Sequence, residues 1–384
     1  MPLKTLHVYC RVVDNFGDAG VCWRLARQLA REHALDVTLW IDRPAVLARL
    51  VPDLTLNAAP GGALVVRPWP EAEPDDAWPD VAVCAFGCDP PAWLRTRLAG
   101  GPVRPLWINL EYLSAEHWVD GCHGLASIKS ADGAREHFYF PGFRATTGGL
   151  AGERGLLAAR DAFRAGGAAA AWWQAHDLPD PPGRRVSIFC YPDAPLVPLL
   201  RAMAEGGEPT LALVAGGAGG DALSQWLNGL DKPTQEHRLP RWQAGKLTLV
   251  RLPMLPIDDY DRLLWSCEVN FVRGEDSWVR GLWAGRPMVW QPYRQTDQAH
   301  RIKLDAFLDW QAPALAGLDP AARTAVSDLS HAWSDGTDPG PAWIRLTRAL
   351  PSLSVAFDAL SRETALQDGL AERQGRADDV AAAD

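Results

Sequence analysis

The sequence has little of what marks a membrane-spanning or secreted protein. No segment reaches the roughly 18 uninterrupted apolar residues that a membrane span needs. Residues Met1–Tyr9 lack the basic region and apolar core of a signal peptide, so we expect a cytoplasmic location and no membrane partner. Seven cysteines, an odd number, favour reduced thiols over a disulfide framework. Cys84 and Cys88 form the only close pair, and nothing nearby completes a zinc site.

The chain also lacks an excess of positive charge, with 38 lysine and arginine residues against 47 aspartate and glutamate residues. The net charge of −9 does not suit a duplex nucleic-acid binder, so we expect no nucleic-acid partner. Neither half carries Gly-x-Gly-x-x-Gly directly after its first strand, which disfavours a nicotinamide oxidoreductase. The glycine cluster 215–220 lacks the lysine of a phosphate-binding P-loop and, taken alone, is typical of a flexible turn. What remains is a globular chain of 384 residues, long enough for two domains.

Apolar strand patterns alternate with helical patterns along most of the chain, which predicts an α/β fold with parallel sheets. The breaker Pro179–Gly183 separates two such halves. We therefore predict Rossmann-like domains over 1–180 and 181–350, facing each other across a cleft, and a C-terminal helix with a frayed tail over 351–384. The expected strands are Leu6–Val13, Val37–Ile41, Leu64–Val66, Val81–Phe86 and Pro105–Asn109, then Arg185–Cys190, Leu211–Ala215, Leu247–Leu252, Val269–Val272 and Met288–Gln291.

The segment Arg11–Leu29 reads as the end of a strand, a turn with two acids, and a helix. Gly17 and Gly20 free the backbone to turn, and Asp14 and Asp18 lie together in that turn. Charged side chains at the carboxyl edge of a parallel sheet are where α/β enzymes place their chemistry. Helix capping is the structural alternative for either acid, but two acids around Asn-Phe-Gly favour a functional site.

The segment Cys267–Pro287 repeats the order of strand, polar turn and helix. Asp276 or Ser277 suits a helix N-cap, and the first amides of that helix, with Arg273, would accept a phosphate. The alternative is that Glu275 and Asp276 merely favour the helix start and pair with Arg273, and spacing alone does not separate these readings. Asp259-x-Asp261 resembles a metal motif but lies at an expected helix start, so we interpret it as capping and expect no metal.

Two aromatic residues, Phe189 and Tyr191, end a strand at this same expected edge, where they could stack on a base. With both acidic turns in place, the chain closely resembles the EarP family, which transfers rhamnose to an arginine of elongation factor P. The resemblance runs in order from about residue 8 to 310 and is far more specific than one turn. Its motifs are Asp14–Leu29, Asn109–Glu116, Phe140–Phe143, Thr147–Leu150, Phe189–Tyr191, Arg273–Ser277 and Trp283–Gly285.

The resemblance implies a GT-B glycosyltransferase that uses dTDP-β-L-rhamnose, inverts the anomeric carbon and needs no metal or other cofactor. It implies elongation factor P as the protein acceptor. Asp18 is then the general base, Asp14 its acidic neighbour, and Glu275 the acid that orients the reacting groups. The donor-binding residues that it implies are Phe16, Gly17, Phe189, Tyr191, Met254, Arg273, Asp276 and Ser277.

The chain departs from the family pattern at two places. Pro253-Met254-Leu-Pro-Ile257 stands where the family reads Pro-Phe-Val-Pro-Gln, although Met254 could pack on thymine. Gln291 and Arg294 stand in a segment that usually reads Trp-His-Ile-Tyr-Pro-Gln. Two other functions stay open on the sequence: a nucleotide-sugar epimerase of the same fold, and a non-enzymatic module that binds elongation factor P.

Overall fold

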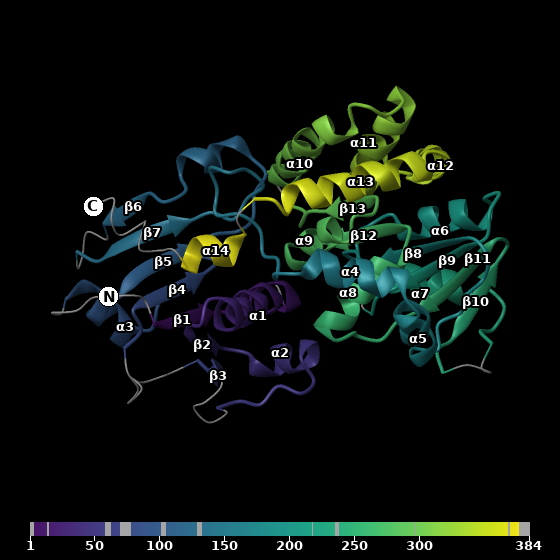
Figure 1. Ribbon diagram of the computed structural model, residues 1–384. Coiled ribbons are helices and arrows are strands. Elements are labelled where there is room, and N and C mark those ends of the chain that lie inside the picture. Colours follow the sequence, from purple (N-terminus) through teal and green to yellow (C-terminus); the bar gives the residue numbers. More distant parts are fainter. Residues whose placement is uncertain are drawn as a thin grey trace. The chain divides into compact units, whose positions relative to one another are not determined.

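The computed structural model describes residues 4–13, 15–57, 63–69, 78–100, 105–128, 133–216, 218–234, 238–295, 297–367 and 369–375. The chain forms two compact units (Figure 1). Unit 1 comprises Met1–Arg154 and Ala365–Asp384, and unit 2 comprises Gly155–Thr364. Among the described residues, no helix is both long and apolar enough to cross a membrane. All seven cysteines are free thiols.

The units divide at Gly155, earlier than the boundary near residue 180 that the sequence analysis places. The reason is that the helices after Gly155 pack within unit 2. Arg164 donates a hydrogen bond of 2.9 Å to the carbonyl oxygen of Trp265, and the indole of Trp172 donates one of 2.8 Å to Asp259. A proline-rich stretch therefore lies inside unit 2, while the chain after Thr364 returns to unit 1.

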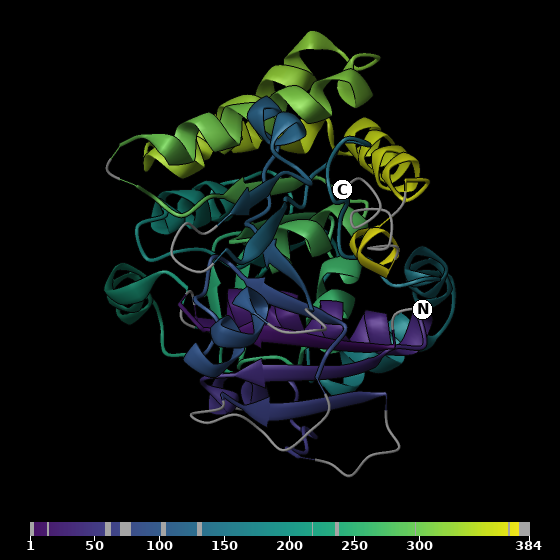
Figure 2. The ribbon, with the colours of Figure 1, turned by 90° about the vertical axis from the view of Figure 1, so that its left-hand side faces the viewer.

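Unit 1 is built on a mainly parallel sheet, and Figure 2 lets the reader follow the side-by-side arrows of β1, β2 and β3. Within the described residues the sheet has seven strands in the order β3-β2-β1-β4-β5-β7-β6. Only β6 is antiparallel to its neighbour. The strands are β1 Thr5–Cys10, β2 Asp36–Ile41, β3 Leu64–Pro68, β4 Val81–Ala85, β5 Leu106–Leu110, β6 Ala126–Ile128 and β7 Arg135–Tyr139.

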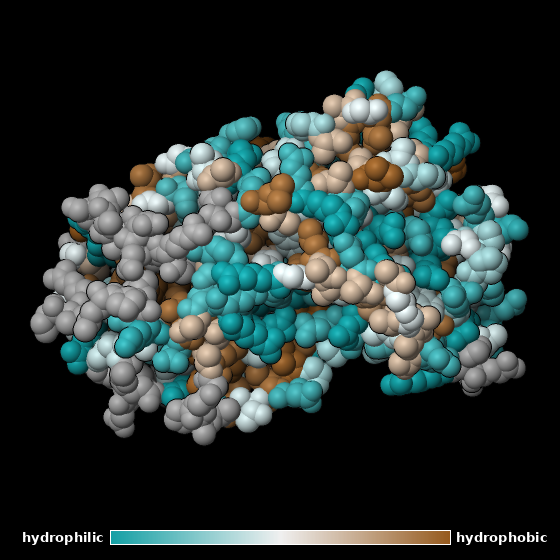
Figure 3. All heavy atoms as spheres, in the orientation of Figure 1, coloured by the Kyte–Doolittle hydropathy of each residue, from teal (hydrophilic) through white to brown (hydrophobic). Residues whose placement is uncertain are grey.

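The longest described helix of unit 1 is α1. Its buried Leu25, Ala26 and Leu29 form the apolar stripe that the sequence predicts. In the view of Figure 3, hydrophilic side chains cover the outer side of α1. On the same helix, the buried Arg24 and the mostly buried Arg27 form ion pairs with Glu153. The helical elements are α1 Asn15–Glu32, α2 Pro44–Leu50, α3 Ala92–Ala99, the 3₁₀ helix η1 His117–Gly121 and α14 Leu370–Gly375.

Unit 2 has a second mainly parallel sheet, in the order β10-β11-β9-β8-β12-β13 among the described residues. Its strands are β8 Arg184–Ile188, β9 Thr210–Val214, β10 Arg241–Ala244, β11 Leu247–Arg251, β12 Val269–Arg273 and β13 Met288–Gln291. Its helices are α4 Leu156–Ala165, α5 Ala168–Ala175, α6 Leu196–Ala204, α7 Gly220–Asn228, α8 Ile257–Ser266, α9 Asp276–Trp283, α10 Ala299–Leu315, α11 Pro320–Asp335, α12 Gly340–Arg348 and α13 Leu350–Thr364.

The strand order of each sheet reverses direction at one place. In unit 1 the chain runs from β1 outward to β3 and then resumes with β4 on the other side of β1. In unit 2 it runs from β8 outward to β11 and resumes with β12 on the other side of β8. The loops on the two sides of such a reversal diverge, which opens a crevice at the carboxyl ends of the strands. The β1/β4 and β8/β12 strand ends are therefore the places to look for a site.

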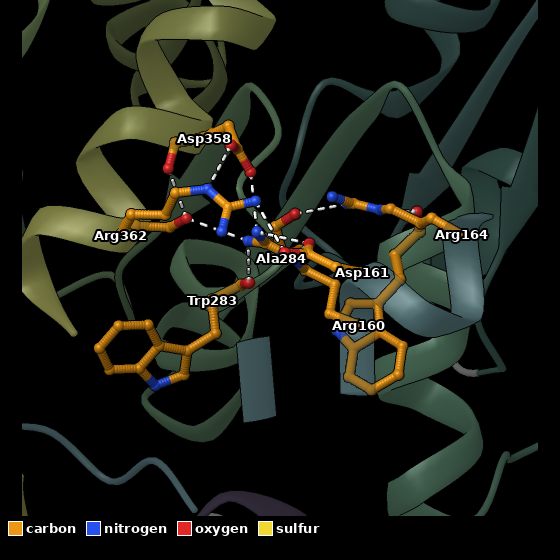
Figure 4. A network of polar contacts seen from close by, with 9 residues as sticks. Arg160, Asp161, Arg164, Trp283, Ala284, Asp358 and Arg362 are labelled. Atoms are coloured by element: carbon orange, nitrogen blue, oxygen red, sulfur yellow. Dashed lines mark hydrogen bonds and ion pairs between the residues drawn. The ribbon is translucent and has the colours of Figure 1, made fainter. Parts of the chain in front are cut away.

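A polar network within unit 2 fixes the carboxyl end of α9 (Figure 4). Arg160 of α4 is fully buried and donates to the carbonyl oxygen of Trp283, to Ser361 and to Asp358, at 2.8 to 3.0 Å. The guanidinium of Arg164 donates to the carbonyl oxygen of Ala284, which follows the last turn of α9. Cations at a helix carboxyl end satisfy its unpaired carbonyl groups and favour its dipole.

The turn after α9 makes this network possible. Gly285 has a φ of +59°, which L side chains rarely adopt, and a Cβ there would lie 2.5 Å from Nη1 of Arg160 and 2.9 Å from Oγ of Ser361. Glycine is thus required both by backbone conformation and by space. The same network joins α4 and α13, the helices that begin and end unit 2.

We predict that Gly285→Ala lowers the free energy of unfolding by about 2 kcal/mol or more, because backbone strain and overlap with Arg160 add together. Chemical denaturation of the purified variants measures this change. Gly317→Ala is the matched control, since Gly317 has no positive φ and no heavy atom within 4 Å of the position that a methyl group would take. The control should stay within about 0.5 kcal/mol of the parent protein. Equal stabilities of the two variants would contradict the requirement for glycine.

Candidate active site

The turn between β1 and α1 carries the first candidate residue. Asp18 lies in the first turn of α1 and is 3% exposed. Its Oδ2 accepts a hydrogen bond of 2.7 Å from the backbone N–H of Val13, and a second acid, Asp42, accepts one of 2.8 Å from Val12. Two carboxylates therefore hold the strand end, and the one on α1 is fixed in orientation. Asp14, the predicted acidic neighbour, lies outside the described residues.

Phe16 and Gly17 lie beside Asp18 in the first turn of α1. The guanidinium of Arg49 lies 5.1 Å from the centre of the Phe16 ring. These two predicted donor-binding residues therefore belong to unit 1, whereas the other six belong to unit 2.

The loop after β4 lies on the other side of the reversal in unit 1. Phe86 and Gly87 both have positive φ there, and the N–H of Gly87 donates to Oδ1 of Asn109 at 3.2 Å. The amide of Asn109 in turn donates to Glu111 at 3.0 Å. Burial, assisted by the charge of Glu136, raises the pKa of Glu111 above its ordinary value. Asn109 thus braces this loop, which is a structural role for its motif.

In unit 2, the side chain of Arg273 contacts the aromatic rings of Phe189 and Tyr191. Its guanidinium carbon lies 4.2 Å from the centre of the Phe189 ring and 4.6 Å from that of Tyr191. Its Nη1 donates a hydrogen bond of 3.0 Å to the carbonyl oxygen of Cys190. This bond uses one of the five N–H donors of a guanidinium. The structure therefore brings together three residues that the sequence analysis selects from two separate motifs.

The turn between β12 and α9 differs from the expected capping. Glu275, not Asp276 or Ser277, precedes the helix, and no side-chain capping bond forms. The hydroxyl of Ser277 instead accepts the N–H of Arg273 at 3.0 Å and donates to the carbonyl oxygen of the same residue. The expected cap is wrong because Ser277 is used to close the turn. Gly274, with a φ of +62°, lets the chain reverse tightly enough for this closure.

Side chains behind this turn hold α9 in place. The ring of Trp290 stacks on Trp278 at a centroid separation of 3.6 Å, and its N–H donates to the carbonyl oxygen of Gly274 at 2.9 Å. Arg280 and Asp261 form a buried, two-pronged ion pair, with N···O distances of 2.9 and 2.6 Å. The position of Asp261 in the sequence predicts helix capping, and its pairing with Arg280 corrects that prediction. A buried pair of this kind is costly to break from one side.

Two further loops end at the same edge of the sheet. The glycine cluster follows β9, and Met254 follows β11, whose neighbour in the sheet is β9. A Cβ on Gly216 would lie 3.3 Å from the carbonyl oxygen of Leu252, so these two loops lie against each other. Met254 is half-buried. Among all these loops, those after β8 and β12 flank the reversal.

Sequence reasoning missed the contact that joins β13 to this site. Gln291, the last residue of β13, accepts the N–H of Tyr191 at 2.8 Å and donates to Asp193 at 3.3 Å. This contact could be anticipated only from the fact that β8 and β13 end at the same edge of the sheet. That fact follows from the strand order, which the sequence alone does not show. Tyr260 was also missed, and its ring lies edge-on to Phe189 with centroids 6.0 Å apart. Burial raises the pKa of the Tyr260 phenol.

One group of side chains within the described ranges has the composition of a metal site: Glu32, His33 and Glu372. It lies at the last turn of α1, opposite to the turn that holds Asp18, so it is not part of the candidate site. Glu32 already accepts hydrogen bonds from Gln28 and from the N–H of Arg154. The residues gathered at the β8/β12 reversal, by contrast, suit an anion with an adjoining flat ring.

Comparison with known proteins identifies the chain's relatives. The family model described as "Elongation-Factor P (EF-P) rhamnosyltransferase EarP" matches residues 6–374. A protein-arginine rhamnosyltransferase of Pseudomonas putida is 42% identical over 371 residues, which cover 96% of each chain. One of Pseudomonas aeruginosa is 38% identical over 370 residues, 95% of this chain and 96% of the relative.

A solved structure has the same fold over nearly the whole chain. It is described as "Structural basis for EarP-mediated arginine glycosylation of translation elongation factor EF-P" and is 32% identical. The match has a TM-score of 0.68 and covers 97% of this chain and 98% of the other. Together with the two parallel-dominated sheets, it confirms the predicted α/β fold of the GT-B class. The chain therefore belongs to the EarP family of elongation factor P rhamnosyltransferases and is a glycosyltransferase.

Proposed function

We propose that this protein transfers rhamnose from dTDP-β-L-rhamnose to one arginine side chain of elongation factor P. The anomeric carbon is inverted, and no metal takes part. The observation that carries this proposal is the position of Arg273, at the carboxyl end of β12, against two aromatic rings and beside the start of α9. Family membership supplies the acceptor and the sugar.

The donor would bind to unit 2 at the β8/β12 reversal. The other N–H groups of Arg273 and the first amides of α9, which begins at Asp276, suit a diphosphate, and Ser277 closes the turn that presents those amides. Phe189, Tyr191 and Met254 would hold the base and sugar. Charge gathers on the diphosphate as the bond to the sugar breaks, so these cationic and amide groups act most strongly in the transition state.

The acceptor arginine is a poor nucleophile because its guanidinium keeps its proton beyond pH 12 and delocalises its lone pairs. Asp18 would grip the guanidinium and receive a proton as the carbon–nitrogen bond forms. As the nitrogen uses its electron pair to form the bond to carbon, positive charge grows on it, so its proton becomes easier to lose during the reaction than before it. Asp14 would support Asp18, and Glu275 would orient the reacting groups. One displacement, in which nitrogen enters as diphosphate leaves, gives inversion.

Arginine takes two opposite parts in this chemistry. In the enzyme a guanidinium is useful because it stays charged and offers several donors in one plane. In the acceptor the same property is the obstacle, because the nitrogen that must attack is protonated. A rigid carboxylate can overcome this obstacle by accepting the proton of the attacking nitrogen. The hydrogen bond from Val13 fixes one oxygen of Asp18, whereas a carboxylate on a mobile side chain would have to be ordered at each turnover.

We predict that incubation of the protein with elongation factor P and dTDP-β-L-rhamnose adds one deoxyhexose to one arginine, as measured by intact-protein and peptide mass spectrometry. Treatment with EDTA should leave the rate unchanged, because Arg273 and backbone amides neutralise the diphosphate. An acceptor with lysine at the modified position is the control. Conversion of the nucleotide sugar without acceptor would indicate an epimerase, and binding of the factor without a mass gain would indicate a binding module. Either outcome would replace the transferase proposal.

We also predict that Asp18→Asn abolishes transfer while dTDP binding is retained, because asparagine can still accept the N–H of Val13 but cannot take up a proton. Asp42→Asn is the matched control, because Asp42 follows β2 and accepts the neighbouring N–H of Val12, and it should keep turnover within about threefold. Arg273→Met should instead weaken dTDP binding first, by about tenfold or more. Calorimetric dTDP affinity and single-turnover rates separate the two effects. Parental turnover in Asp18→Asn would remove the base assignment.

A further inference from the structure

The side chain of Gln291 connects the end of β13 to the loop after β8 at the donor edge. Gln291 is 2% exposed and lies in register with Arg273, its partner across the β12–β13 pair. Its Oε1 accepts the N–H of Tyr191 at 2.8 Å, so the carboxamide reaches past the end of β12 to the loop after β8. On the way it donates from Nε2 to Oδ1 of Asp193 at 3.3 Å.

The partner of this carboxamide is itself held from the other side. Nε of Arg294 lies 3.4 Å from Oδ2 of Asp193, and its Nη2 donates to the carbonyl oxygen of Ser334 at 2.8 Å. Asp193 thus lies between a buried amide and a guanidinium anchored on α11. One oxygen of Asp193 accepts a hydrogen bond and the other forms an ion pair. The loop after β8 is therefore held both at the main chain of Tyr191 and at the side chain of Asp193.

We propose that Gln291 is a positioning residue for the nucleotide-sugar donor, an inference that rests on the proposed function above. Its carboxamide fixes the main chain of Tyr191, and this keeps the phenol ring over the Arg273 guanidinium at 4.6 Å. The guanidinium is then held from two sides, by the ring and by the carbonyl oxygen of Cys190. The loop after β8 and the strand β12 together set the direction of the other N–H groups of Arg273. Because those groups would contact the donor, donor binding depends on this arrangement.

The requirement for a carboxamide follows from the polarity of its two partners. The N–H of Tyr191 needs an acceptor, and the Asp193 carboxylate needs a donor. Glutamine supplies both at one side-chain end. Glutamate supplies only acceptors and places like charges together, whereas methionine supplies neither while keeping similar volume. Replacing Asp193 with a residue that can donate a hydrogen bond should therefore restore donor binding to Gln291→Glu. The same replacement should not restore donor binding to Gln291→Met.

The test compares Gln291→Glu, Asp193→Asn, the double variant Gln291→Glu/Asp193→Asn, and Gln291→Met. Each is measured for dTDP affinity by calorimetry, for donor KM and kcat in transfer, and for Tm. We expect Gln291→Glu to raise the dTDP Kd and the donor KM about tenfold, with kcat within about twofold. The double variant should return both constants to within about threefold of the parent, because an asparagine amide can donate to the new carboxylate.

Two single substitutions serve as references for the size of these effects on dTDP affinity. Asp193→Asn alone should have a small effect, since glutamine can still donate to the asparagine oxygen and the Asp193–Arg294 ion pair is partly exposed to solvent. Gln243→Glu is the matched control, an exposed glutamine on the edge strand β10 of the same sheet, and should behave as the parent. A merely structural role for Gln291 would lower Tm and leave dTDP affinity of the folded protein unchanged.

Parental Kd and KM in Gln291→Glu, or a double variant no better than the single one, would overturn the positioning role. If Gln291→Glu does not fold, Gln291→Met and the double variant still decide the matter, because only the double variant is expected to bind dTDP as the parent does. Failure of the proposed function is separable from all of these results. A parent protein that binds no dTDP and transfers no rhamnose would contradict the function itself.

Discussion

The cation of Arg273 is the constraint around which unit 2 is arranged. A guanidinium at the end of a buried strand loses part of its favourable hydration free energy and needs other contacts to replace it. Here two aromatic rings and one carbonyl oxygen contact it. Contacts between a guanidinium and a ring contribute about 0.5 to 2 kcal/mol each, depending on desolvation. Those groups come from the end of β8, so the pairing of β8 with β12 is what assembles the site.

The helix that follows Arg273 is fixed at both ends by different means. At its start, Ser277 closes the turn onto the backbone of Arg273, and Trp290 holds the carbonyl oxygen of Gly274. At its carboxyl end, two arginines from α4 donate to the last carbonyl groups. A helix held in this way presents its first amides in one direction, which suits a group that must stabilise developing charge without moving.

The local patterns in the sequence are enough to predict where most strands lie. All ten predicted strands overlap observed ones, because an apolar run that ends in a turn indicates a buried parallel strand whatever surrounds it. Strands β6, β7 and β10 were missed. Two of these are edge strands, and β7 reads Arg-Glu-His-Phe-Tyr, so pairing rather than apolar sequence makes them strands.

The sequence by itself also determined which residues carry the chemistry to be considered. Asp18, Tyr191, Arg273 and Ser277 stand in motifs whose order along the chain is specific to one family. Only the tertiary structure decided what each side chain touches. Ser277 closes a turn, Asp261 neutralises Arg280, and Gln291 holds the main chain of Tyr191, 100 residues away. Such contacts depend on strand order and register, which bring distant residues within a few ångströms, and no local pattern encodes that distance.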